Sequence, residues 1–392
     1  MNFKSFTKGG MAAVMAMSLA ACSSSSSASA TADGAFKLGI SGPLTGDAAV
    51  YGKAVENAVN LAVEEVNAAG KVKLAFKMED DQASGDMAVT AYNNLADWGM
   101  QISLGTVTSG AGQAVSPTLK QDNIFALTPS ASSTGVVLAD TKDTSSYFGN
   151  VFQMCFTDPN QGSASAVYMS EHFEGKKVGV IYRNDDNYST GVYQTFVDKA
   201  EDLGIDIVST QTFQDGATDF TVQVQQLAAA GSEVIFLPIY YQPATLILQA
   251  AKAQGVEATF FGSDGMDGIL AQPGFDPALA EGLYMLTPFS ADAKDEKTAN
   301  FVKNYKEKFS DTPNQFAADA YDCVYAIAQA IEAGELTADM STDDITAGLV
   351  KQFTSMTFNG ITGTSVTWSE NGEVTKAPKA IVVNNGVYVS AE

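Results

Sequence analysis

Residues 36–70 read FKLGISGPLTGDAAVYGKAVENAVNLAVEEVNAAG. The segment opens with an apolar run of strand length, and a polar turn follows it. From Ala49 onward, apolar residues recur every three or four positions, which is the spacing of a helix with one buried face. Gly70 stands where such a helix ends. The stretch therefore predicts one strand followed by one helix.

The same unit recurs along the chain in two series of similar size, one before residue 150 and one after it. This alternation predicts an α/β fold of two lobes, each with a parallel sheet and helices on both faces. Near the C-terminus, 357–374 and 379–390 predict short strands, with an Asn-Gly turn at Asn371-Gly372. The other expected strands are 36–41, 72–80, 101–107, 124–129, 151–156, 176–183, 206–213, 233–240 and 259–265, and the expected helices are 49–70, 85–98, 111–121, 160–173, 188–203, 218–230, 242–254, 295–309, 315–333 and about 342–352.

The first 21 residues have the features of an export signal. Lys4 and Lys8 precede the apolar segment MAAVMAMSLAA, and small residues stand directly before Cys22. This junction resembles the lipobox of bacterial lipoproteins, in which the Cys is lipidated after cleavage. We therefore expect a signal peptide over 1–21 and a lipidated Cys22 with a flexible tether over 22–35, an ordinary secretory signal being the alternative. The apolar segment is too short for a membrane-spanning helix, which needs roughly 20 residues.

The net charge limits the possible binding partners, and the cysteine positions indicate the state of the thiols. The chain has a formal net charge of −23, which becomes about −25 once the leader and its two lysines are removed. Such a surface repels nucleic acid and anionic lipids, so we expect no nucleic-acid partner. Cys155 and Cys323 each lie in an apolar run, which favours buried free thiols and leaves a disulfide between them open.

The residues that common catalytic motifs require are absent. His172 is the only histidine, and its helical context predicts a surface position. Gly105 and Gly110 have the spacing of a phosphate-binding loop, but Ala111 and Gly112 stand where Lys and Ser/Thr are required. No GxGxxG follows the first strand. We therefore expect no metal site and no cofactor, and only catalysis by carboxylates alone stays open.

A loop at 104–117, LGTVTSGAGQAVSP, is suited to holding an anion. Ser109 precedes a predicted helix, and Gly110, Ala111 and Gly112 leave the first N–H groups of that helix uncovered. A helix N-terminus attracts negative charge, and a hydroxyl adds a hydrogen-bond donor. The alternative is that Ser109 simply caps the helix.

The motifs together resemble one known family. The chain is similar to the leucine/isoleucine/valine-binding proteins of ABC importers in a series of stretches. In chain order these are residues 39–70, DDQASGD, GTVTSGAGQAVSP, FALTPSAS, the Tyr188 region, IYYQPATLILQAAKAQG and FFGSDGMDG. The resemblance implies the type 1 periplasmic binding fold, two Rossmann-like lobes with parallel sheets joined by a three-segment hinge. The implied lobes are 36–156 with 288–366, and 157–287 with 367–392.

The resemblance also implies roles for individual residues. Members hold the α-carboxylate of an amino acid at the positions of Ser109 and of Ser130, Ala131 and Ser132, although an ordinary turn is an alternative for Ser130. The position of Asp264 takes the ammonium where other members have Glu, and the alternative is a turn residue before Gly265. Tyr188 and Tyr240 would cover the ligand, whereas Tyr241 would belong to the core. Tyr51 and Val107 would line the side-chain pocket, with burial against the helix as the alternative for Tyr51.

The implied function is capture of an aliphatic or branched-chain amino acid by a lipoprotein on the extracytoplasmic face of a bacterial membrane. The implied partners are the permease and ATPase of an ABC importer, and the membrane is reached only through the lipid at Cys22. We expect a monomer that is not an enzyme. The alternatives are binding of a small amide or of an aromatic or short-chain carboxylic acid, a sensing module for a partner receptor, and a carboxylate-driven hydrolase.

Overall fold

The computed structural model describes residues 27–28 and 34–391. The expected signal peptide and Cys22 lie outside these residues, so cleavage and lipidation stay predictions. Within the described part of the chain, no helix has the length and apolar character that crossing a membrane requires.

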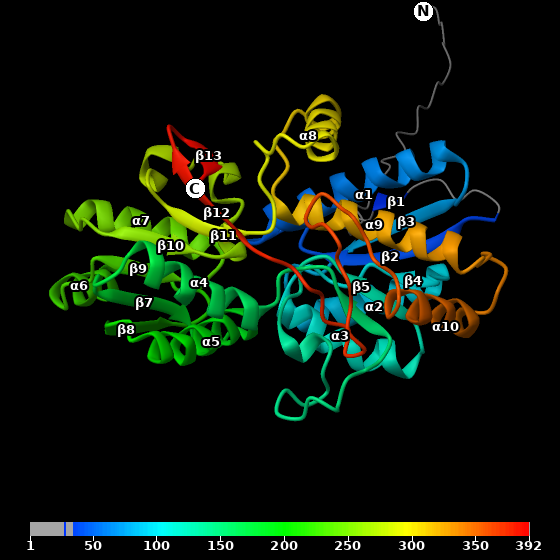
Figure 1. Cartoon of the computed structure of the whole chain (residues 1–392), viewed down its shortest axis with the longest axis horizontal. Helices are drawn as coiled ribbons and strands as arrows, with labels where there is room; N and C mark the ends of the chain where they lie inside the picture. Colours follow the sequence, from blue (N-terminus) through cyan, green and yellow to red (C-terminus); the bar gives the residue numbers. More distant parts are fainter. Residues whose placement is uncertain (1–26, 29–33, 392) are drawn as a thin grey trace, which may run out of the picture.

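The first lobe is built on a six-stranded sheet with the order β1-β3-β2-β4-β5-β6 (Figure 1). All neighbouring strands are parallel except β1, which pairs antiparallel with β3. The strands are β1 (Ser27–Ala28), β2 (Phe36–Gly42), β3 (Leu74–Asp80), β4 (Ile102–Ser103), β5 (Phe125–Thr128) and β6 (Val151–Gln153). The helices are α1 (Ala49–Ala69), α2 (Gly85–Trp98), α3 (Ser109–Gln121), the short η1 (Thr134–Val136), α8 (Glu296–Phe309), α9 (Gln315–Ala333) and α10 (Thr342–Phe353).

The second lobe is built on a seven-stranded sheet with the order β13-β12-β11-β10-β9-β7-β8. Its strands are parallel apart from β12, which runs antiparallel to both neighbours. They are β7 (Val178–Arg183), β8 (Ile207–Phe213), β9 (Val234–Leu237), β10 (Thr259–Gly262), β11 (Tyr284–Thr287), β12 (Lys379–Asn384) and β13 (Val387–Ser390). The helices are α4 (Asp158–His172), α5 (Asn187–Leu203), α6 (Thr221–Ala229), α7 (Tyr241–Gln254) and the short η2 (Asp264–Met266), η3 (Ile269–Ala271) and η4 (Pro277–Ala280).

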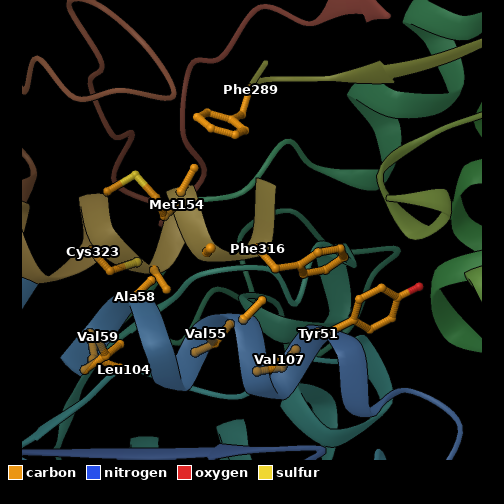
Figure 2. Close-up of a cluster of buried hydrophobic side chains, with 14 of the residues drawn as sticks. Tyr51, Val55, Ala58, Val59, Leu104, Val107, Met154, Phe289, Phe316 and Cys323 are labelled. Atoms are coloured by element: carbon orange, nitrogen blue, oxygen red, sulfur yellow. The ribbon is translucent and has the colours of Figure 1, made fainter. Parts of the chain in front are cut away.

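Helix α1 shows how the sequence pattern becomes packing. Its apolar face, which includes Val55, Val59 and Val66, is buried, and the helix packs against α9. Figure 2 shows part of this core, where side chains of α1 and α9 meet. Burying one such aliphatic side chain contributes roughly 1.5–3 kcal/mol. The helix ends at Gly70, whose φ of 77° lies in the left-handed region that glycine adopts without strain.

The chain passes between the two sheets three times. The passages follow β6, follow β11 and precede β12. Residues just before the third passage pack on the first lobe, because the Trp368 indole donates to the Gln153 carbonyl at 2.7 Å and stacks edge-on against Phe353. After this passage, the chain joins the second sheet at β12, which starts at Lys379. The last segment of the second lobe was expected to start at residue 367, so its first strand begins well after that boundary.

The two-lobed α/β fold is confirmed, and so are most elements, with local differences. The strand expected over 101–107 covers only Ile102–Ser103, because the chain turns at Gly105, which has a φ of 64°. The 357–374 region forms two isolated bridges instead of regular strands, Phe358 with Val366 and Trp368 with Val374, and the second spans a turn at Asn371-Gly372. Two residues of the expected tether pair with β3 as β1. Cys155 and Cys323 are buried free thiols, as the sequence favoured.

Candidate ligand site between the lobes

A small cavity lies where loops from both lobes meet. Its volume is about 10 Å³, close to the space that one water occupies. The loops after β4 and β5 and the start of α1 and α9 line it from the first lobe, and the starts of α5, α7 and η2 line it from the second. The lining residues are Tyr51, Val107, Thr108, Ser109, Ser130, Ser132, Tyr188, Tyr240, Asp264, Gly265 and Phe316. We call it the central cavity.

The first wall of the central cavity is formed by the N-terminus of α3. The first bond of this helix runs from the Gly112 N–H to the Thr108 carbonyl, so the preceding N–H groups have no partner within the helix. Thr108 is the N-cap residue, and its side chain makes no capping bond. The Ser109 hydroxyl accepts a bond from the Ser133 N–H at 3.2 Å. Simple capping by Ser109, the alternative considered from the sequence, is therefore wrong.

The turn after β5 completes this wall. Ser130 and Ser132 are buried and line the central cavity, and the Ser130 hydroxyl donates to the Val107 carbonyl at 2.7 Å. Ala131 does not line it. The Ala131 N–H donates to the Thr128 hydroxyl, and its carbonyl accepts from the Gln153 amide, so both of its backbone groups are used inside the lobe.

Asp264 supplies the charged group of the second wall. It is 4% exposed, and its Oδ2 accepts a bond from the Gln161 amide at 2.8 Å. The pKa of this carboxyl is raised to about 7, chiefly by burial and also by the nearby Asp319 carboxylate, and the bonds from Tyr188 and Gln161 limit the rise. A cationic partner would stabilise the ionised form of such a buried carboxyl, so its binding is favoured there.

Two tyrosines stand beside Asp264. The Tyr188 hydroxyl accepts from the Gly265 N–H at 3.0 Å and lies 3.1 Å from the Gln161 Oε1, to which it donates. The rings of Tyr188 and Tyr240 stack with centroids 5.2 Å apart. Tyr240 was expected at the end of a strand, but β9 ends at Leu237, and Tyr240 is the N-cap residue of α7.

Tyr51 links the two lobes directly. Its hydroxyl donates to the Gly265 carbonyl and accepts from the Tyr241 N–H at 3.3 Å. Its ring stacks on Phe316 with centroids 4.1 Å apart, and Figure 2 shows both rings at the end of the buried cluster, with Val107 close by. Tyr51 is thus both buried and at the cavity, so the two alternatives for it are compatible. Tyr241 belongs to the core, as expected.

The structure adds residues that the sequence reasoning did not select. Thr108, Gly265 and Phe316 also line the central cavity. Asp158, the first residue of α4, is 2% exposed, and neither of its carboxylate oxygens has a hydrogen-bond partner. Burial raises the pKa of Asp158 well above its ordinary value. Thr108 lies in the 104–117 loop and Gly265 follows the selected Asp264, but no sequence pattern pointed to Phe316 or Asp158.

Two larger pockets flank the central cavity. One, of about 590 Å³, lies between the start of α1 and the β12–β13 turn, and neither Ser109 nor Asp264 lines it. The other, of about 460 Å³, is lined by Gln82–Ser84 and Thr108 of the first lobe and by Arg183, Asp186, residues 213–218 and Tyr240 of the second. We call the latter the outer pocket. We assign the ligand site to the central cavity because groups that favour an anion, at the N-terminus of α3, and the Asp264 carboxyl, which favours a cation, both line it.

The site has the groups for binding a zwitterion. Helix N–H groups and serine hydroxyls face it from one side, and a carboxyl faces it from the other. His172 is exposed on α4 and stacks on Tyr168, so no imidazole is available to activate a serine of the cavity. Among residues 27–28 and 34–391, no cluster of three or more His, Cys, Asp or Glu side chains could hold a metal ion.

Two α/β lobes around a polar cavity, joined by three passages of the chain, define a bilobal solute-binding protein. The family model described as periplasmic binding protein matches residues 35–386, and the chain belongs to this family. A curated relative is the leucine-, isoleucine-, valine-, threonine-, and alanine-binding protein of Pseudomonas aeruginosa. It is 27% identical over 305 residues, which cover 76% of this chain and 79% of the relative.

Solved structures agree with this assignment. The branched-chain amino acid transporter substrate binding protein LivJ from Streptococcus pneumoniae, in complex with isoleucine, has a TM-score of 0.81 and 26% identity, and covers 91% of this chain and 99% of that one. An ABC transporter solute binding protein from R. palustris, in complex with benzoate, has a TM-score of 0.79 and 18% identity, over 91% and 96% of the two chains. The second likeness shows the fold alone.

Proposed function

We propose that this chain is the solute-binding lipoprotein of an ABC importer and that it captures an amino acid, with an aliphatic or branched-chain one as the first expectation. The observation that supports this most is the pairing of two walls with opposite preferences. The N-terminus of α3 favours a carboxylate, and the buried Asp264 favours an ammonium group.

Capture proceeds by closure of the lobes. The first lobe binds the α-carboxylate through Ser109, Ser130 and Ser132 and the free N–H groups of α3. Closure then brings Asp264 onto the ammonium group and the rings of Tyr188 and Tyr240 over the ligand. The hydrogen bond from Tyr51 to Gly265 joins the lobes around the water-sized cavity, so the lobes part to admit a ligand and this contact favours their closing again.

A simple carboxylic acid is the main competing ligand, because a structural neighbour is a complex with benzoate. Benzoate would satisfy the first wall and leave Asp264 without a cationic partner. The pKa of Asp264 shows that burial already disfavours its charge, and Asp158 adds a second buried carboxyl nearby. A ligand that brings a positive charge therefore gains more from this site than one that does not.

The remaining parts of the proposal concern the ends of the chain and its partners. The signal peptide over 1–21 and lipidation at Cys22 place the protein on the extracytoplasmic face of the membrane. The lobes we propose are 36–156 with 288–366 and 157–287 with 367–392, acting as a monomer that delivers its ligand unchanged to a permease with an ATPase. The sensing alternative requires a separate receptor chain as partner.

Calorimetry with matched ligands tests the proposal. Leucine carries both charges, 4-methylpentanoate lacks the ammonium group, isopentylamine lacks the carboxylate, and benzoate represents the aromatic acids. We expect binding by α-amino acids only, with a dissociation constant of roughly micromolar order. Tight binding of benzoate or 4-methylpentanoate without any amino acid binding would refute the amino-acid assignment. Turnover of amide or ester analogues would refute the transport role.

A further inference from the structure

Thr108 has an unused hydrogen-bonding group at the ligand site. The residue is 5% exposed, and its Oγ1 has no hydrogen-bond partner. Its backbone, with φ −102° and ψ 149°, is the extended conformation that an N-cap residue adopts, yet the side chain does not cap α3. A buried hydroxyl without a partner costs free energy, so it points to a partner that arrives with the ligand.

Neighbouring hydroxyls of the central cavity differ from Thr108 in this respect. Ser109 accepts from the Ser133 N–H, Ser130 donates to the Val107 carbonyl, and Tyr188 accepts from the Gly265 N–H. Each of these three groups has a fixed role within the protein before any ligand contact. Thr108 therefore differs from these three hydroxyls, because none of its bonding capacity is used within the protein.

The position of Thr108 indicates which part of a ligand it meets. Thr108 and Tyr240 line both the central cavity and the outer pocket, whereas Ser109, Ser130 and Ser132 line only the central cavity. The central cavity has a volume of about 10 Å³, and the outer pocket of about 460 Å³. A side chain attached to an α-carbon in the central cavity would therefore reach the outer pocket by passing Thr108.

The outer pocket has charged groups in an otherwise mixed lining. Arg183 lines it and is paired with Asp185 at 2.7 Å and with Asp215 at 2.9 Å, and Asp186 lines it as well. Asp186 caps α5 by accepting from the Ser189 N–H. These charges favour a polar group on the ligand side chain, although Phe213, Ile239 and Pro243 give the same pocket apolar surface as well.

We propose that the Thr108 hydroxyl hydrogen-bonds the side chain of the bound amino acid, so that the site favours a side chain with a hydroxyl or amide over an aliphatic one of equal size. This inference rests on the proposed function and, among the amino acids, ranks those with a hydroxyl or amide above the aliphatic ones that were the first expectation there. A ligand whose side chain has no hydrogen-bonding group leaves the Thr108 hydroxyl unpaired in the closed site. This cost lowers its affinity relative to a ligand that supplies such a group.

Threonine and valine test the inference, since they have nearly the same shape and differ in one hydroxyl. Calorimetry on the mature protein gives the ratio of their affinities for the wild type, Thr108→Val and Thr108→Ser. We expect the wild type to prefer threonine, Thr108→Val to lower the threonine-to-valine ratio by about tenfold, and Thr108→Ser to keep it. Thr108→Val should also raise the melting temperature of the ligand-free protein, because it removes an unpaired buried hydroxyl.

Thr106→Val is the matched control. Thr106 is also buried, but its hydroxyl donates to the Thr108 carbonyl and it lines neither pocket. We expect this variant to leave the ratio unchanged and to lower stability. An unchanged threonine-to-valine ratio in Thr108→Val overturns the inference. If both ligands lose affinity equally, the inference is overturned as well, because Thr108 instead contacts the backbone atoms that the two ligands share. Absence of binding by any α-amino acid refutes the proposed function itself.

Discussion

Replacing Asp264 by Asn tests the charge that the proposed function depends on. The substitution keeps the size of the side chain and keeps an oxygen that can accept from the Gln161 amide, but it removes the negative charge. A hydrogen bond to a charged group contributes roughly 1.5–3 kcal/mol, which corresponds to about 10- to 150-fold in affinity. We expect a loss of this size at pH 8, and complete loss of amino-acid binding with an intact fold for Asp264→Ala.

The pH dependence makes the test sharper. With its pKa at about 7 in the ligand-free protein, Asp264 is mostly ionised at pH 8 and mostly protonated at pH 5.5. An ammonium group binds the ionised form, so wild-type affinity should fall roughly 30-fold between these pH values, by the usual proton linkage. Asp264→Asn has no such proton to release. Its affinity should change little, and the two proteins should converge at low pH.

Isothermal titration calorimetry between pH 5.5 and 8, with the tightest amino acid of the panel, measures both effects. Asp267→Asn is the matched control, because Asp267 is equally buried and accepts from the Gln315 N–H but does not line the central cavity. We expect its affinity to stay within about twofold of the wild type. Wild-type affinity in Asp264→Asn, or an equal deficit at both pH values, would contradict an ammonium contact.

Three further predictions concern closure, stability and anchoring. Tyr51→Phe should weaken ligand binding about tenfold while keeping the stacked ring on Phe316, because it removes the bond between the lobes, and X-ray scattering should show a more open protein with ligand. The ligand-free protein should melt at a higher temperature at pH 5.5 than at pH 8. Burial raises the pKa of Asp264 from 3.8 to about 7 and that of Asp319 to about 6, so the stability gained from protonating them in the folded state is complete below pH 3.8 and is lost as the pH rises through the raised values. An equal or higher melting temperature at pH 8 would contradict this. Cys22→Ala should release the protein from the membrane fraction of cells, and lipid labelling that persists in this variant would refute the anchor.

The sequence determined the fold class through local periodicity. The alternation of strand-length runs with amphipathic segments was enough to place α2 at Gly85–Trp98 and α9 at Gln315–Ala333, because each repeats one spacing over several turns. The resemblance then selected Ser109 and Asp264, because they match the family's binding positions. Both come after strands of the parallel sheets, β4 and β10, and such positions gather at one edge of a sheet. The fold class was therefore readable without any knowledge of contacts.

Only the tertiary structure decided which side chains converge and which keep free bonding capacity. Ala131 and Ser130 are neighbours in the sequence, yet one is turned into the lobe and the other lines the cavity. The unpaired hydroxyl of Thr108 and the carboxyl of Asp158 are properties of burial by distant segments. Tyr51 meets Gly265 across 214 residues of chain. Such relations depend on how two lobes pack, and local periodicity carries no information about that packing.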